Sequence, residues 1–318
     1  MDSNLNVFSL TPVASSEGVW CFAFGENLML LLWNPSIKKS VGISVPNYTF
    51  QPNSPKMIFG FGIRLVTLEP TLLKINYPLY SDGPWYVSVS TLSSRTWYNL
   101  DYDCLPRQSI RIKRAGQAVI DGKIFWIGSE RFYNDDGISY KIYLIVSFDL
   151  VTHQFHVQEM PEQVRVGEFS PPYYISQLGD SLIISGSFNF GDCRIIYAWA
   201  LKVEGGFVLS CSLLFTIPHP AGHYLKLHRF SKDNQPIVEA TIVQQWYRSL
   251  HVFHLTIQYF QNIDVEANRD SFFIGMFTVL IIINTKFQTG DIIVKSTFRH
   301  APVNVENGSF PGYLVATL

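Results

Sequence analysis

The sequence is poor in charged residues and has no excess of either sign. Asp, Glu, Lys and Arg make up only 15% of the 318 residues, and 24 basic residues stand against 25 acidic ones. Binding to nucleic acid or to an anionic membrane usually relies on a strongly basic surface. We therefore expect neither nucleic acid nor a membrane among the partners.

Cysteine is also scarce. The four cysteines are far apart and form no CxxC pair; they are Cys21, Cys104, Cys193 and Cys211. A chain of this length can build its core without disulfide bonds, which are typical of small secreted domains. We therefore expect reduced thiols in a cytoplasmic or nuclear protein.

Signals for secretion and for membrane insertion are missing as well. Residues 1–18 lack the basic segment and the continuous apolar core of a signal peptide. The longest apolar run, Phe272 to Ile283, is too short to span a bilayer. We predict that this run forms one or two buried strands.

Short segments typical of β-strands fill most of the chain. They alternate in hydrophobicity or are rich in Val, Ile, Tyr, Phe and Trp, and Gly, Asn, Asp and Pro lie between them. Clear examples are residues 85–92, 142–149 and 195–201. No stretch of twelve residues has a helical stripe with caps, so an all-β fold is predicted.

One unit recurs about five times: an apolar strand, a polar turn, and a second strand led by an aromatic or apolar residue. Its instances are residues 31–39, 89–97, 146–155, 197–207 and 252–260. Equivalent turns are roughly 50 to 60 residues apart, the size of a four-stranded propeller blade with long loops. Dividing the chain length by this period gives about six blades.

A second kind of hairpin lies between these units. Asp121-Gly122 and Gly179-Asp180 supply the positive φ angles that tight turns need. Inner and outer hairpins therefore alternate, as in a β-propeller of four-stranded antiparallel sheets, whose closed ring hides its sheet edges. The alternative is a pair of β-sandwiches, although no linker rich in Pro, Gly or Ser divides the chain.

Several motifs follow one another in an order that resembles the plant F-box-associated, kelch-like domains of F-box proteins. The chain has LLWNPSIKKSVGISVPNY at residues 31–48, FGFG at 59–62, VSTLSSRTW at 89–97 and VIDGKIFWI at 119–127. Further on it has LIVSFDL at 144–150, LGDSLIISG at 178–186 and YAWALK at 197–202. The resemblance covers roughly residues 19 to 285.

This resemblance implies a domain organisation and a function. It implies an N-terminal extension at residues 1–18, an F-box-associated propeller at 19–295, and a C-terminal strand or tail at 296–318. Such domains recognise protein substrates of SCF-type ubiquitin ligases, so we expect an unknown protein partner, no cofactor and no enzymatic activity. No helical F-box precedes the first blade, so a Skp-type adaptor is not expected to bind.

Two other functions remain open. The chain could be a truncated F-box protein without a ligase role. It could also be a propeller-fold hydrolase or glycosidase with its site in the axial funnel. The second alternative would require convergent carboxylates, or a histidine with a perturbed pKa, in the largest pocket.

The histidines and paired acids do not make a strong case for a metal or for catalysis. His219 and His223 are four residues apart, but the prolines and glycine between and around them exclude the helix that would align both rings. The pairs Asp101/Asp103 and Asp135/Asp136 lie at turn signals, where Asp fixes local backbone structure. No GxSxG elbow, phosphate-binding loop or dinucleotide fingerprint is present.

Aromatic-rich loops are the stronger candidates for recognition, because Trp, Tyr and Arg supply much of the binding energy at protein interfaces. The candidate protein-binding residues are Trp85, Tyr86, Arg131, Phe132, Tyr133, Tyr173 and Tyr174. The basic stretch 107–114 alternates with apolar residues and is predicted to be the solvated face of an edge strand.

Overall fold

The computed structural model describes residues 10 to 267, except for 25–28, 47–55, 78–83, 114–115, 166–169, 191–192, 221–222 and 243–246. Strands dominate this part of the chain. Its helices are the single turns η1 (Tyr102–Cys104) and α1 (Glu162–Arg165). Within the described residues no helix has the length and apolar character needed to cross a membrane.

The strands form antiparallel sheets that follow one another along the chain. The first blade contains β1 (Leu10–Ser16), β2 (Val19–Phe24), β3 (Met29–Asn34) and β4 (Lys39–Ser44). The second contains β5 (Lys56–Ile63), β6 (Pro70–Tyr77), β7 (Tyr86–Thr91) and β8 (Trp97–Asn99). The third contains β10 (Ala118–Ile120), β11 (Lys123–Tyr133), β12 (Ser139–Asp149) and β13 (Phe155–Glu159), with β9 (Arg111–Ile112) added beside β11.

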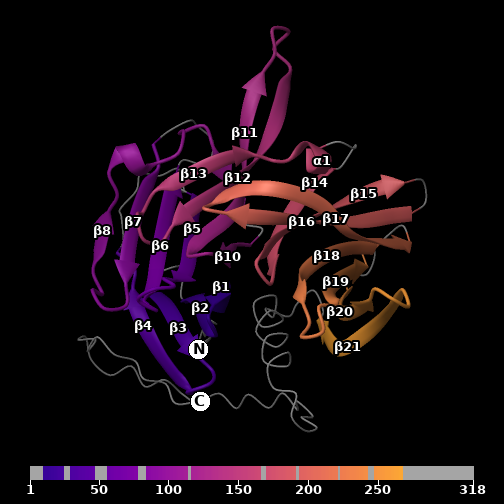
Figure 1. Ribbon diagram of the computed structural model, residues 1–318, viewed down its shortest axis with the longest axis horizontal. Helices are drawn as coiled ribbons and strands as arrows, with labels where there is room; N and C mark the ends of the chain where they lie inside the picture. Colours follow the sequence, from indigo (N-terminus) through magenta and orange to yellow (C-terminus); the bar gives the residue numbers. More distant parts are fainter. Residues whose placement is uncertain are drawn as a thin grey trace, which may run out of the picture.

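The last two blades complete the ring. The fourth contains β14 (Ser170–Leu178), β15 (Ser181–Phe190), β16 (Cys193–Glu204) and β17 (Phe207–Pro220). The fifth contains β18 (His223–Phe230), β19 (Pro236–Ile242), β20 (Tyr247–His254) and β21 (Tyr259–Ala267). In each blade the strands pair in the order of the sequence, and Figure 1 shows the sheets arranged around a centre.

The predicted all-β propeller is confirmed, and the described residues form five blades where about six were expected. The five recurring units of the sequence are the outer hairpins of the five blades. Their turns contain residues with positive φ: Lys38, Arg95, His153, Gly205 and Gln258. The expectation of six came from dividing the whole chain length by the period, which includes residues outside these units. Counting the recurring units directly gives five.

The inner hairpins were predicted from their turns as well. Asp121 has φ 49° and Gly122 has φ 69°, as a two-residue turn between β10 and β11 requires. Gly179, with φ 55°, turns the chain between β14 and β15. Local turn chemistry therefore sets both hairpins of a blade.

Side chains connect the inner edges of neighbouring blades. The Ile63 N–H donates to Ser16 Oγ at 3.2 Å, which joins the first two blades. The Gln117 amide accepts from the Phe61 N–H at 3.2 Å and donates to the Phe61 carbonyl at 2.5 Å, which joins the second blade to the third. These bonds satisfy backbone N–H and C=O groups on the free edge of β5, where no neighbouring strand can pair with them. They also connect neighbouring blades near the centre.

Two sequence predictions concern segments at or beyond the ends of the propeller. β1 begins at Leu10, inside the segment 1–18 that was expected to be an extension. The apolar run 272–283 and the expected tail 296–318 lie outside the described residues. The basic stretch 107–114 contributes the short strand β9, and Arg107 pairs with Glu130 at 2.6 Å.

The packing between the second and third blades leads to a test of the fold. A Cβ atom on Gly60 would lie 2.7 Å from Cζ2 of Trp126, a ring that is 1% exposed. Because a buried indole has little room to move, we expect Gly60→Ala to lower the free energy of unfolding by about 1 to 3 kcal/mol. Urea denaturation measures this, and Ser212→Ala on the exposed face of β17 is the control. Equal stability of the two variants would contradict the packing.

Candidate functional site

The inner strands of four blades enclose a cavity of about 520 Å³, here called the central cavity. It is lined by Pro12, Val13, Ala14, Ser15, Trp20, Gly116, Gln117, Ala118, Val119, Ile175, Ser176, Gln177, Gly179, Lys226, Leu227, His228, Arg229 and Phe230. These residues belong to β1, β2 and β18, to β14 with the turn residue Gly179 that follows it, and to β10 with the residues just before it. The volume lies within the usual range for small-molecule sites, about 300 to 1,000 Å³.

A β-bulge in β18 brings two consecutive side chains to the central cavity. Leu227 pairs with Val238 and Arg229 pairs with Ile237, so His228 is the extra residue between them. In a regular strand successive side chains point to opposite faces, whereas a bulge re-aims them. Both His228 and Arg229 therefore line the cavity, together with Leu227, which is 3% exposed and packs in the core between the fourth and fifth blades.

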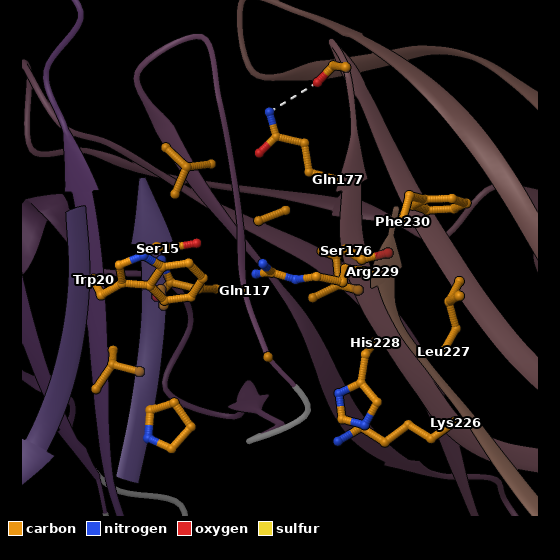
Figure 2. Close-up of a pocket in the computed structure, with 18 residues that line it drawn as sticks. Ser15, Trp20, Gln117, Ser176, Gln177, Lys226, Leu227, His228, Arg229 and Phe230 are labelled. Atoms are coloured by element: carbon orange, nitrogen blue, oxygen red, sulfur yellow. Dashed lines mark hydrogen bonds between the residues drawn. The ribbon is translucent and has the colours of Figure 1, made fainter. Parts of the chain in front are cut away.

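Arg229 reaches across the central cavity from the last blade toward the first (Figure 2). Its guanidinium carbon lies 5.1 Å from the ring centre of Trp20 on β2. Burial lowers the pKa of Arg229 to about 10, so the group is still charged at neutral pH. Among the described residues no carboxylate forms an ion pair with it.

A second cavity of about 230 Å³ adjoins the first and shares Ser15, Trp20, Val119, Gln177 and Arg229 with it. Its lining includes the exposed Glu17 at the turn between β1 and β2. Arg229 and Trp20 therefore lie at the boundary between the two cavities. The described lining of the larger one has no acidic residue, and that of the smaller one has a single carboxylate, Glu17.

Lys226 is the second cation of the central cavity. Its ammonium group lies 5.4 Å from the ring centre of Tyr174 on β14. No Asp or Glu appears among the residues described as lining this cavity, although the whole chain has a net charge of −1. The cavity therefore concentrates positive charge in a nearly neutral protein.

His228 is held by a carboxylate on the neighbouring strand. Its Nε2 lies 2.7 Å from Oε2 of Glu239 on β19. Burial lowers the pKa of His228, and the hydrogen bond to Glu239 opposes this shift only in part. In the neutral ring Nε2 carries the proton that it donates to Glu239, so Nδ1 has a free lone pair.

The structure places three predicted recognition residues on the β11–β12 hairpin, which projects from the ring in Figure 1. Arg131 is exposed, Phe132 stacks on Tyr140 with ring centres 5.7 Å apart, and Tyr133 is 66% exposed. These side chains are available to a partner, but they lie outside the central cavity.

The other predicted recognition residues do not form one surface. Trp85 stacks on Tyr77 and donates from Nε1 to the Ile110 carbonyl at 3.2 Å, and Tyr173 packs against Tyr143. With exposed fractions of 1% and 3%, Trp85 and Tyr173 belong to the core and have no surface to offer a partner. Tyr86 is 40% exposed. Tyr174 is half-buried and lies beside the central cavity through its contact with Lys226.

The sequence analysis predicted inner hairpins but did not identify the cavity residues that the inner strands contribute. The segment 223–230 has a Lys, a His and an Arg within an otherwise strand-like run. In a propeller, basic side chains on such a strand are expected at the central channel or at the outer rim, so this segment was the available signal for the site. The histidines of the sequence were weighed only as possible metal ligands. The described residues contain no group of three His, Cys, Asp or Glu that could hold a metal ion. The side chains of His219 and His223 lie outside the described ones.

No family model and no curated protein matches this chain. Among solved structures it is similar to the hemagglutinin-neuraminidase of parainfluenza virus 5 with the ligand DANA, at 9% identity and a TM-score of 0.43 over 83% of each chain. It is also similar to a structure titled YjhT, at 11% identity and a TM-score of 0.38 over 80% of this chain and 83% of that one. The relationship to F-box-associated domains stays a prediction.

The expectation that this chain is not an enzyme is corrected by the site itself. The central cavity contains a histidine with a lowered pKa beside a carboxylate, which is one of the features that the hydrolase alternative requires. The exclusion of catalysis is therefore withdrawn.

The environment of His228 predicts its protonation state. We expect a neutral ring at pH 7 with the proton on Nε2, and protonation only below the ordinary value near 6.5. The unfolded chain takes up this proton first as the pH falls, so His228 lowers the stability below about pH 6.5 and has no such effect above it. Two-dimensional ¹⁵N NMR of the imidazoles, assigned with His228→Gln, measures both properties. Titration of His228 at or above pH 6.5 would contradict the prediction.

Proposed function

We propose that the central cavity binds a small organic anion, with a carboxylate or similar oxyanion at Arg229 and an apolar body along the cavity wall. The observation that supports this most directly is the guanidinium of Arg229, which faces the cavity without an ion-pair partner among the described residues. Buried charges in proteins are normally paired, because removing an ion from water is costly. A bound anion would supply the missing charge.

The remaining lining fits such a ligand. Arg229 can bind a carboxylate with two parallel N–H donors, and Lys226 adds a second positive charge. Val13, Ile175 and Phe230 supply apolar surface from three different blades. Ser15 and Ser176 are neutral groups that can donate or accept further hydrogen bonds.

Isothermal titration calorimetry with benzoate tests this proposal, with benzamide as the neutral ligand of the same shape. We expect benzoate to bind and benzamide to bind at least about tenfold more weakly, because only the anion pairs with Arg229. Arg229→Gln should weaken benzoate binding by about 10- to 100-fold, and Arg229→Lys should retain part of it.

The matched control is Arg131→Gln, because Arg131 is an exposed arginine on the β11–β12 hairpin. Its affinity for benzoate should equal that of the wild type. Circular dichroism confirms that each variant folds. If benzoate binds folded Arg229→Gln as tightly as the wild type, Arg229 is not the anion site and the proposal fails.

A second candidate function is the recognition of a protein partner, supported by the projecting β11–β12 hairpin. The described residues expose Tyr133 at 66%, Ile138 at 64% and Tyr140 at 51% at its end. Aromatic side chains on a rigid hairpin are well suited to anchor a protein interface. The resemblance to F-box-associated domains is compatible with this role.

Site-specific photocrosslinking tests the hairpin in a lysate of the source cells. A photoreactive residue at Tyr133 should capture one or a few proteins, whereas the same residue at Ser212 on β17 should not. Replacing Tyr140 with Ser should reduce the capture at Tyr133 several-fold, because it removes the stacking partner of Phe132. Equal capture at both positions would argue against recognition by the hairpin.

A further inference from the structure

We propose that His228, oriented by Glu239, is a general base in the central cavity and that the protein hydrolyses small esters that carry a carboxylate. This inference rests on the proposed function, because the same cavity must first bind the anion. It goes beyond that function by assigning a reaction and the group that moves the proton.

The first support is the position of the ring. His228 lines the central cavity next to Arg229, and the bulge in β18 turns both side chains toward it. Its Nε2 is occupied by Glu239 at 2.7 Å. No partner of Nδ1 is found in the described part of the chain. Because His228 lines the central cavity, we take the lone pair of Nδ1 to be the group that can accept a proton there.

The second support is the arrangement of base and carboxylate. A histidine whose protonated nitrogen is held by a carboxylate keeps one tautomer and one orientation, as general bases of hydrolases do. Glu239 also stabilises the imidazolium that forms when Nδ1 takes a proton. Glu239 lies on β19, outside the cavity lining, and therefore acts as a positioning residue.

The charges around His228 favour its neutral form. The charged groups that act on it are Lys226 and Arg229 on its own strand and Glu239 on β19. The cavity residues of β1 and β14 are uncharged. Burial lowers the pKa of His228 most, the hydrogen bond to Glu239 raises it in part, and the two cations lower it further. The ring is thus unprotonated at neutral pH, as a base must be before the reaction.

The proposed step requires only water and the ester. Arg229 holds the carboxylate of the substrate. Nδ1 of His228 takes a proton from a water molecule as the water oxygen bonds to the carbonyl carbon, and the electron pair of the C=O bond moves to its oxygen. When the intermediate collapses, the C–O bond to the alcohol breaks and the alcohol oxygen receives the proton from Nδ1. The products are a carboxylic acid and an alcohol.

An ester fits this cavity better than a glycoside. Glycosidases generally use two carboxyl groups on opposite sides of the scissile bond, about 5 to 9.5 Å apart. The described lining of the central cavity contains no carboxylate. Acyl transfer needs a base and hydrogen-bond donors for the developing oxyanion, and the hydroxyl groups of Ser15 and Ser176 can donate from this lining.

The test is the hydrolysis of mono-4-nitrophenyl succinate, followed by release of nitrophenolate against a blank without protein. The neutral 4-nitrophenyl butyrate is the comparison substrate. We expect kcat/KM to be higher for the anionic ester, and His228→Gln to lower it at least about 100-fold. His254→Gln, at an exposed hairpin end of the same blade, should leave it unchanged.

The pH dependence of ester hydrolysis tests the positioning role of Glu239. The rate of the wild type should fall as the pH drops through the lowered pKa of His228, below about 6.5. Glu239→Gln should lower kcat about tenfold and move this acidic limb further down, because the carboxylate no longer stabilises the imidazolium. Glu239→Asp should restore part of kcat. A merely structural role would leave the position of the limb unchanged.

Benzoate binding separates the two proposals. If folded His228→Gln binds benzoate normally but no longer hydrolyses the ester, both proposals hold. If the wild type binds benzoate but does not hydrolyse the ester, or if His228→Gln hydrolyses it as fast as the wild type, the general base is overturned and the anion site stands. If the wild type binds no benzoate, the proposed function fails as well.

Discussion

The contact between Arg229 and Trp20 is the interaction on which the centre of this molecule depends. Every blade consists of consecutive strands in the described chain, so no strand is shared between the first blade and the last. Arg229 on β18 and Trp20 on β2 meet across this seam at 5.1 Å. A cation over an indole ring contributes about 2 kcal/mol when it is shielded from water. The contact thus links the two ends of the ring and also leaves a guanidinium charge facing the cavity.

The properties of the site follow from that placement. The bulge at His228 brings a base and a cation to one side of the central cavity, and Glu239 on the next strand fixes the ring of the base. Arg229 and Lys226 line the central cavity without an Asp or Glu among its described lining residues, so their positive charges act together on a ligand there. The proposed binding of an anion and the proposed removal of a proton thus depend on the same short segment of β18.

The fold was predictable because the signals that define it are local. The turns at Lys38, Arg95, His153 and Gln258 and the Asp121-Gly122 pair mark hairpins without reference to the rest of the chain. The site was not predictable, because it depends on the closure of the ring: Trp20 and Arg229 are more than 200 residues apart in the sequence and meet only after the first and last blades close it. The search of aromatic loops also selected Trp85 and Tyr173, whose large apolar surfaces are used in packing. The bulge that re-aims Arg229 leaves no mark in the sequence pattern.

The most direct test of the central claim is to locate a bound anion in the molecule. A crystal soaked with 4-iodobenzoate reports the ligand through the anomalous signal of its iodine. We expect one strong peak inside the central cavity, with the carboxylate against Arg229, and no such peak in crystals of Arg229→Gln. An empty central cavity in wild-type crystals, or a carboxylate bound there away from Arg229, would contradict the claim.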